Sequence, residues 1–150
     1  MERRTKRVDT REYVAILREL TEQGNEVCMR VAGNSMTPFL VHERDEIRFR
    51  RPDRPLKRGD MVFYQRRDGA FVMHRVCRVR KNGYFLIGDA QTESEGPIAQ
   101  EQIFGLVTAV RRKGQWIRAG SFWWEFFARV WIWVIPLRRF LRRMYGWIRR

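Results

Sequence analysis

The spacing of the hydrophobic positions changes twice along the chain. Between residues 10 and 24 the apolar side chains recur at helical spacing, and Asp9 or Thr10 can cap the predicted helix. From residue 27 to about residue 119 the apolar segments are short and rich in Val, Ile, Phe and Tyr, and several alternate with polar residues, which predicts strands. After residue 120 the polar positions return at spacings of three, four and seven residues, which again favours a helix.

The predicted strands are separated by sequences that favour tight turns. These sequences are Arg67-Asp68-Gly69, Lys81-Asn82-Gly83 and Lys113-Gly114. Short strands at regular spacing indicate a mainly β fold, either a small antiparallel sandwich or a partly open barrel. We therefore predict three parts: an N-terminal helical segment at 1–26, a β domain at 27–119 and an amphipathic helical tail at 120–150.

Charge sets the tail apart from the β domain. Hydrophobic residues make up 44% of the 150 residues, which excludes a wholly disordered chain, and the net charge is +14. From Arg111 onward, 11 basic residues stand against one acidic residue, a net charge of +10. The first 110 residues hold 20 basic and 16 acidic residues, a net charge of only +4. A basic tail of this kind points toward anionic lipid or nucleic acid rather than toward an acidic substrate of the β domain.

The tail is also strongly aromatic. Five of the six tryptophans lie in residues 121–150. One side of the predicted helix carries Trp123, Trp124, Phe126, Phe127, Trp131 and Trp133. Pro136 is expected to kink or break the helix. Because this face is too large for one small β domain to cover and arginines flank it, we predict that it lies on a membrane surface rather than in the core.

Three features bear on localisation and partners. The N-terminus has no apolar segment of the kind found in cleavable signal peptides. The longest apolar run, from Phe122 to Leu137, contains Glu125 and Arg129 and has arginines on both sides, so we expect peripheral attachment to the cytoplasmic face of a membrane instead of a span. The aromatic residues gather on one side of a helix instead of across a sheet, so a specific nucleic acid is not the expected partner.

Cysteine and histidine usage argues against cofactor chemistry. Cys28 and Cys77 lie in apolar, strand-like segments, and we expect both to be buried free thiols. Two cysteines and two histidines without ligand spacing do not suggest a metal site, and no glycine-rich phosphate loop is present. The sequence predicts neither a metal nor a cofactor.

Three stretches of the β domain carry residues suited to hydrolysis. Ser35 follows an apolar strand and precedes Pro38, which favours an exposed hydroxyl beside its own backbone N–H, as a nucleophile with an oxyanion donor requires. His74 lies in a strand and, as a neutral imidazole, can accept the serine proton near pH 7. The loop at residues 88–96 offers three carboxylates that could orient the imidazole.

Each of these features also has a purely structural interpretation. The serine can be an ordinary turn residue, the strand histidine a hydrogen-bonded structural residue, and the acidic loop a solvated one. The second histidine, His42, lies in a charged loop, where we expect it to be solvated, although it could line the groove beside the serine.

The order of these stretches and their residue sequences resemble a known family. Four boxes match in order: Ser35-Met36-Thr37-Pro38, Arg58-Gly59-Asp60-Met61-Val62, Val72-Met73-His74-Arg75-Val76 and Gly88-Asp89. Together they resemble the nucleophile, strand-entry, base and G-D motifs of the signal peptidase and LexA-type serine peptidase superfamily. The sequence His74-Arg75-Val76 is similar to the "H-R-V" motif of the endoplasmic-reticulum and archaeal signal peptidases, in which histidine replaces the lysine base. The resemblance covers about residues 27–110.

What the resemblance implies is a mostly β fold with an edge groove for an extended peptide, and a cofactor-free serine peptidase activity. Ser35 takes the place of the nucleophile and His74 that of the general base. The acidic partner, usually an aspartate a few residues past G-D, corresponds to Glu95, with Asp89 as the competing choice. The position two before the nucleophile is Gly33, so the Ser35 amide is the obvious oxyanion donor. The N-terminal membrane anchor usual in signal peptidases is not expected here.

The functional hypothesis is a serine endopeptidase that cleaves an extended peptide or precursor and is tethered to the membrane surface by its C-terminal helix. The alternative is a catalytically inactive, peptidase-like module that binds a peptide at the same membrane surface. The glutamate at the acid position and the plain Gly33 favour this alternative.

Overall fold

The computed structural model describes residues 10–31, 33, 35, 36 and 39–131, together with positions 134, 137, 140, 143, 144 and 147. Several sequence-based expectations fall on residues outside this set. They are the cap at Asp9, the motif residues Thr37 and Pro38, the aromatic Trp133 and the kink at Pro136.

Two helical segments enclose a run of eight strands in the described part of the chain. The elements are α1 (Thr10–Glu22), β1 (Val27–Arg30), β2 (Glu46–Arg50), β3 (Met61–Gln65), β4 (Phe71–Arg80), β5 (Gly83–Ile87), β6 (Glu95–Ile98), the 3-10 turn η1 (Gln100–Gln102), β7 (Ile103–Arg112), β8 (Gln115–Arg118), α2 (Phe122–Glu125) and its wider continuation η2 (Phe126–Trp131). The three predicted turns all lie between paired strands, β3–β4, β4–β5 and β7–β8.

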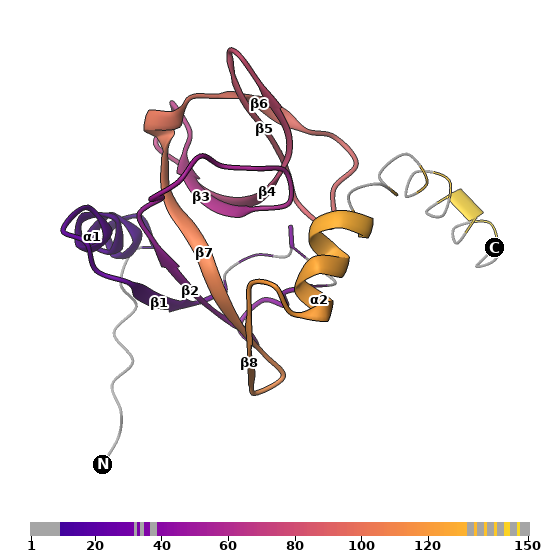
Figure 1. The fold of residues 1–150 in the computed structure, drawn as a ribbon, viewed down its shortest axis with the longest axis horizontal. Helices are drawn as coiled ribbons and strands as arrows, with labels where there is room; N and C mark the ends of the chain where they lie inside the picture. Colours follow the sequence, from indigo (N-terminus) through magenta and orange to yellow (C-terminus); the bar gives the residue numbers. More distant parts are fainter. Residues whose placement is uncertain are drawn as a thin grey trace.

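The strands form a single antiparallel sheet, which confirms the predicted mainly β fold. Its order is β1-β2-β7-β3-β4-β5-β6, and β8 pairs with β7. Figure 1 shows the sheet strongly curled, with α1 and α2 on opposite sides of it. Bulges in the β2–β7, β3–β7 and β4–β5 pairings accompany this curvature.

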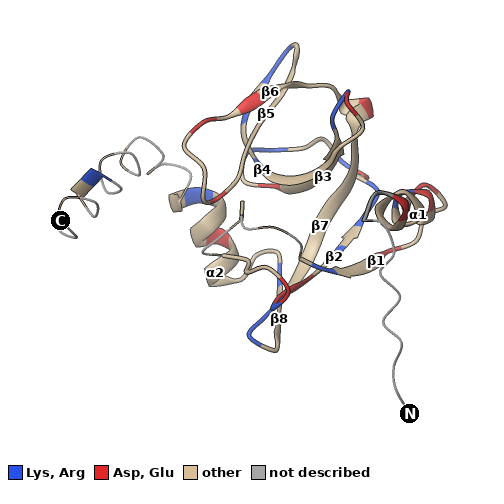
Figure 2. Ribbon diagram, turned by 180° about the vertical axis from the view of Figure 1, so that it is seen from behind, with Lys and Arg blue, Asp and Glu red and all other residues tan. Residues whose placement is uncertain are grey.

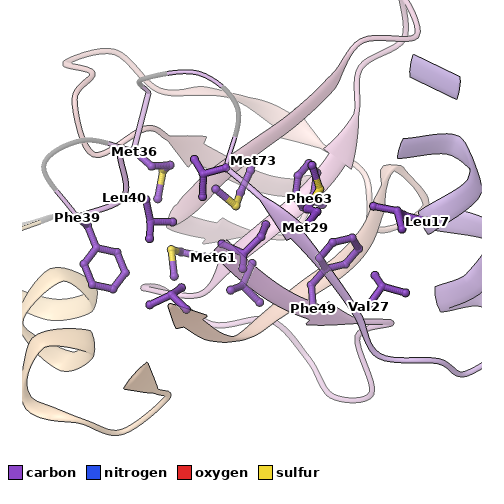
Figure 3. Close-up of a cluster of buried hydrophobic side chains, with 14 of the residues drawn as sticks. Leu17, Val27, Met29, Met36, Phe39, Leu40, Phe49, Met61, Phe63 and Met73 are labelled. Atoms are coloured by element: carbon purple, nitrogen blue, oxygen red, sulfur yellow. The ribbon is translucent and has the colours of Figure 1, made fainter. Parts of the chain in front are cut away.

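Alternation along β3 divides the interior into two clusters. Met61 and Phe63 belong to the larger cluster, whereas Val62 and Tyr64 belong to the smaller one. The larger cluster also takes buried side chains from α1, β1, β2, β7 and the C-terminal helix. Figure 3 shows part of it, with Met36 beside Met61 and Met73. Because β3 is buried on both faces, a polar side chain on it, such as that of Tyr64, lies inside the protein.

Part of the aromatic tail belongs to this core. Trp124 and Phe127 are buried, and both rings pack against Phe39, with centroid distances of 6.2 Å and 4.7 Å. Phe122 and Trp123, in contrast, are exposed. The prediction that the whole aromatic face lies on a membrane is therefore wrong for Trp124 and Phe127, which belong to the core. None of the described helices is long and apolar enough to span a membrane.

The expected burial of the cysteines is also corrected. Cys28 is exposed, because side chains on β1 alternate and Val27 and Met29 take the inward positions. Cys77 is half-buried and its thiol donates to the Phe85 carbonyl at 3.2 Å. Both are free thiols.

Candidate active site

Ser35 lies in the loop after β1 and is held through its backbone. Its carbonyl accepts a hydrogen bond from the Ala90 N–H at 2.9 Å. Two residues earlier, Gly33 adopts a left-handed φ of +87°, and its N–H donates to His42 Nδ1 at 2.7 Å. Met36, directly after the serine, is 2% exposed and anchors the loop in the core. Ser35 itself is half-buried at the protein surface.

His74 lies on β4, and strand register relates it to Ser35. The β4–β5 pairing ends at Arg75 and Ile87, and continuing the same register by one residue places Gly88 across from His74. Residues directly opposite one another project to the same face, with Cβ atoms about 4.5–5.5 Å apart. A Cβ placed on Gly88 would lie 2.4 Å from the Ser35 carbonyl oxygen and 3.0 Å from the Ser35 Cβ. Ser35 therefore covers Gly88 on the face from which the His74 side chain projects.

The structure thus brings the serine and the histidine to neighbouring positions on one face. Their side chains are not in direct contact: among the described residues, no hydrogen bond joins the Ser35 hydroxyl to the His74 ring. Hydrogen bonds between a nucleophile and its base are often loose in the absence of substrate, so the arrangement is compatible with catalysis.

The Nδ1 atom of His74 contacts a polar chain that leads from Tyr64 in the smaller cluster to partly exposed side chains at the surface. The Tyr64 hydroxyl oxygen lies 3.2 Å from His74 Nδ1 and donates to Glu95 Oε2 at 2.8 Å. Arg66 donates to both oxygens of Glu95, at 2.8 Å each. The chain Arg66–Glu95–Tyr64–His74 therefore links β3 and the residue after it to β6 and β4. Glu95, one of the predicted acids, reaches the imidazole only through Tyr64.

Burial and these contacts set the charges in the chain. Burial lowers the pKa of His74 to about 4, against a smaller raising effect of Glu95, so the ring is neutral at pH 7. Burial and the hydrogen bond to Glu95 raise the pKa of Tyr64, which stays protonated. Burial alone would raise the pKa of Glu95, but the hydrogen bonds from Arg66 and Tyr64 outweigh it and lower that pKa, so the carboxylate is ionised.

Asp89, the competing acid, has a different partner. Both of its carboxylate oxygens accept from Arg75, at 2.9 Å each, and the two side chains are 1% and 0% exposed. Arg75 also donates to the Gly59 carbonyl at 3.0 Å. The Asp89 carbonyl accepts from the Trp131 indole N–H at 2.8 Å. The structure therefore does not bring the Asp89 carboxylate to His74. Its pairing with Arg75 instead holds the turn whose next residue, Ala90, binds the Ser35 carbonyl.

Comparison with protein-family models matches residues 3–108 to the family described as Peptidase S24-like. The chain belongs to this Peptidase S24-like family. The match contains Ser35, His74, Glu95 and Asp89, and it ends within β7, so β8 and the C-terminal helix lie outside it. Comparisons with curated proteins and with solved structures gave no match.

A small, mainly apolar cavity of about 150 Å³ opens beside Ser35 of this S24-like domain. Its lining comes from α1, β1, the serine loop, β3 and β4: Val14, Met29, Val31, Gly33, Ser35, Met36, Phe63, Phe71, Val72 and Met73. A concave, apolar site next to a serine is suited to an apolar side chain of an extended peptide.

Three polar residues of the S24-like site were not predicted from the sequence. Tyr64 could have been found from the sequence, because the turn predicted at residues 67–69 sets the β3–β4 register and places Tyr64 diagonally from His74. Arg66 follows two residues later, directly before that turn. No sequence pattern indicated the Arg75–Asp89 pair. His42, expected in solvent or along the groove, is partly exposed and supports the serine loop through Gly33.

Proposed function

We propose that this S24-like domain is a serine endopeptidase in which Ser35 is the nucleophile and His74 the general base. The observation that carries the proposal is the stacking of Ser35 on Gly88, directly across from a histidine that burial keeps neutral. A neutral imidazole at this position does the work of the lysine base found in typical LexA-type enzymes, as in the histidine-type signal peptidases that the sequence resembles.

The proposed reaction follows the ordinary course of acyl transfer. His74 takes the proton from the Ser35 hydroxyl as its oxygen attacks the scissile carbonyl, and the Ser35 amide stabilises the oxyanion. The protonated imidazole then gives its proton to the leaving amine, and the scissile C–N bond breaks. A water molecule, activated by the same base, hydrolyses the acyl-enzyme and releases Ser35. Glu95 is the acid we favour over Asp89, because Glu95 is linked to the His74 ring through Tyr64, whereas the Asp89 carboxylate pairs with Arg75.

An extended peptide is the proposed substrate. β1 is at one end of the sheet order, so its outer edge is available for an added strand within the described fold. Val31, Gly33 and Ser35, which follow β1, line the apolar cavity, and this cavity would receive one side chain of that peptide. Main-chain pairing would supply affinity, and the cavity would select for apolar residues.

The direct test compares Ser35→Ala and His74→Ala with the native chain. Rates are measured with a fluorophosphonate probe and with a complex peptide library read by mass spectrometry. Both variants should lose labelling and cleavage while keeping a native unfolding transition. Ser94→Ala, an exposed serine in the acidic loop, is the matched control and should react normally. Full activity in either active-site variant ends the proposal.

A peptide-binding module without turnover is the second candidate function. It is favoured by the absence of a hydrogen bond between Ser35 and His74 among the described residues, and by Gly33, which offers no side-chain donor to an oxyanion. Saturable binding of library peptides to the native chain, with no cleavage or labelling, would select this candidate.

We further propose that the tail attaches the protein to an anionic, cytoplasmic membrane surface. The described tail exposes apolar side chains at helical spacing: Leu137, Phe140, Met144 and Trp147. The net charge of +10 from Arg111 onward suits anionic lipid. Figure 2 shows basic residues beside β8 and acidic residues on α1.

Vesicle sedimentation of the full chain tests this attachment. Binding should be strong to vesicles containing phosphatidylglycerol, weak to pure phosphatidylcholine, and reduced by Trp147→Ala, whose indole is 86% exposed. Trp116→Ala, in β8, is the matched control. Equal binding to both vesicle types, or preferred binding to an oligonucleotide, contradicts the lipid assignment.

A further inference from the structure

We propose that Tyr64 is a positioning residue that fixes the tautomer of His74, so that Nε2 is the nitrogen that receives the Ser35 proton. This inference rests on the proposed function for its catalytic meaning. Its structural part, the position of one proton on one ring, can be tested independently of activity.

The argument begins with the single proton of the Tyr64 hydroxyl. Two acceptors lie within reach of that hydroxyl, Glu95 Oε2 at 2.8 Å and His74 Nδ1 at 3.2 Å. An ionised carboxylate can only accept, so the short contact to Glu95 requires that Tyr64 donate its proton there. The hydroxyl oxygen is then left with lone pairs toward His74.

The contact to His74 must therefore run in the opposite direction. With the Tyr64 proton committed to Glu95, the 3.2 Å contact is a hydrogen bond only if Nδ1 carries hydrogen and donates it. A neutral imidazole has one N–H, so Nε2 is unprotonated. Nε2 is then the ring nitrogen that can accept a proton, as a general base must, because the tyrosine contacts the Nδ1 atom.

Rigid partners hold Tyr64 in this role. Its side chain is fully buried and lies diagonally from His74 across the β3–β4 pair, where Tyr64 faces Val72 and His74 faces Val62. Glu95 cannot turn away easily, because Arg66 binds both of its oxygens. A buried Nδ1–H without an acceptor would be unfavourable, so the tyrosine also satisfies a group that water cannot reach.

The arrangement also explains how a glutamate can serve at the acid position. The charged groups that face His74 are Glu95 and Arg66, and the tyrosine lies between the carboxylate and the ring. The negative charge of Glu95 polarises the Tyr64 O–H bond, which makes its oxygen a better acceptor for the imidazolium that forms during attack. No proton needs to leave Tyr64 or reach Glu95 at any step.

Tyr64→Phe is the decisive variant, because it removes the acceptor and keeps the ring. The first measurement is the ¹⁵N spectrum of the histidine side chains, which distinguishes protonated from unprotonated ring nitrogens. The chain has only two histidines, and His42→Ala assigns their signals. In the native chain, His74 should show a protonated Nδ1 and an unprotonated Nε2. In Tyr64→Phe, the two tautomers should be mixed.

The second measurement is the rate of fluorophosphonate labelling at Ser35. Loss of the preferred tautomer should slow labelling about 10–100-fold, less than the roughly 10⁴-fold effect of forcing the wrong tautomer in a Ser-His-Asp triad. Tyr84→Phe is the matched control: its hydroxyl also donates to a side chain, Gln100 at 2.9 Å, but lies outside the site, and both readouts should stay native.

The outcomes separate this inference from the proposed function. An Nε2–H tautomer in the native chain, or an unchanged tautomer in Tyr64→Phe, overturns the role of Tyr64. Labelling that persists in Ser35→Ala overturns the peptidase proposal and leaves the tautomer result untouched. If Tyr64→Phe does not fold, Glu95→Gln supplies the test, because it removes the charge that orients the tyrosine hydroxyl and should also mix the tautomers.

Discussion

Gly88 offers the sharpest test of the geometry that joins the serine to the histidine. In Gly88→Ala the new methyl carbon would lie 2.4 Å from the Ser35 carbonyl oxygen and 3.0 Å from its Cβ. Contacts to a Cβ essentially never fall below 3.0 Å, so the carbonyl must retreat by at least about 0.6 Å. The same oxygen accepts from the Ala90 N–H, so this retreat weakens the bond that holds the loop.

A displacement of this size is large for a nucleophile. Misplacing a reacting group by about 1 Å can cost about 10²-fold in rate, so we expect Gly88→Ala to reduce labelling and cleavage roughly 10–100-fold. Overpacking and the weakened hydrogen bond should lower the free energy of unfolding by only about 1–3 kcal/mol. The domain should therefore stay folded while the reaction slows.

The assay pairs fluorophosphonate labelling with urea unfolding, and Gly114→Ala is the control. A Cβ at Gly114 meets nothing within 4 Å, but its φ of +80° strains any other residue. That variant should lose about 1–2 kcal/mol of stability and react at the native rate. If Gly88→Ala keeps native activity, Ser35 does not need its position over Gly88, and the reasoning that links it to His74 fails.

Three further predictions concern the surroundings of the site. Asp89→Asn leaves the buried Arg75 charge unpaired and should lower the free energy of unfolding in urea by about 3–5 kcal/mol; a loss under about 1 kcal/mol contradicts a structural role for the pair. Trp131→Phe removes the donor to the Asp89 carbonyl, and it should slow labelling several-fold and lower the free energy of unfolding by about 1 kcal/mol. The control Trp123→Phe changes a half-exposed residue of α2 and should leave both the labelling rate and the stability unchanged. The pKa of His74 is lowered from 6.5 to about 4 on folding, so the unfolded chain binds the proton first as the pH falls. The contribution of His74 to the free energy of unfolding is therefore fully present above pH 6.5, and on the order of 2–3 kcal/mol of it is lost between pH 6.5 and 4. Urea unfolding at several pH values, with His74→Gln as the reference chain, should show this loss. Parallel plots of stability against pH for the two chains refute the assigned burial effect.

Much of the β architecture was predictable because its signals are local. The turn sequences at 67–69, 81–83 and 113–114 each connect paired strands. The burial of Cys28 was predicted wrongly for a local reason as well. An apolar segment does not reveal which of its two faces turns inward, and Val27 and Met29 decide it.

The tail was predicted as one surface, but the structure divides it. Trp124 and Phe127 are buried against Phe39, whereas Trp123, next to the first of them, is half-exposed. Periodicity gives the width of an aromatic face, and it cannot tell how much of that face a neighbouring loop will cover. The Phe39 ring that covers it comes from a segment about 85 residues earlier in the chain.

The sequence by itself predicted the strands, their turns and the family, and it proposed the serine and the histidine as site residues, because motif sequences and period-2 alternation are properties of neighbouring residues. Only the tertiary structure decided that Glu95 reaches the imidazole through Tyr64 while Asp89 pairs with Arg75. The physical reason is that both carboxylates lie in one short acidic stretch of sequence, Asp89 in the turn after β5 and Glu95 at the start of β6. Which cation or hydroxyl each one meets depends on the pairing of β4 with β5 and of β5 with β6, and a buried charge is stable only with a partner.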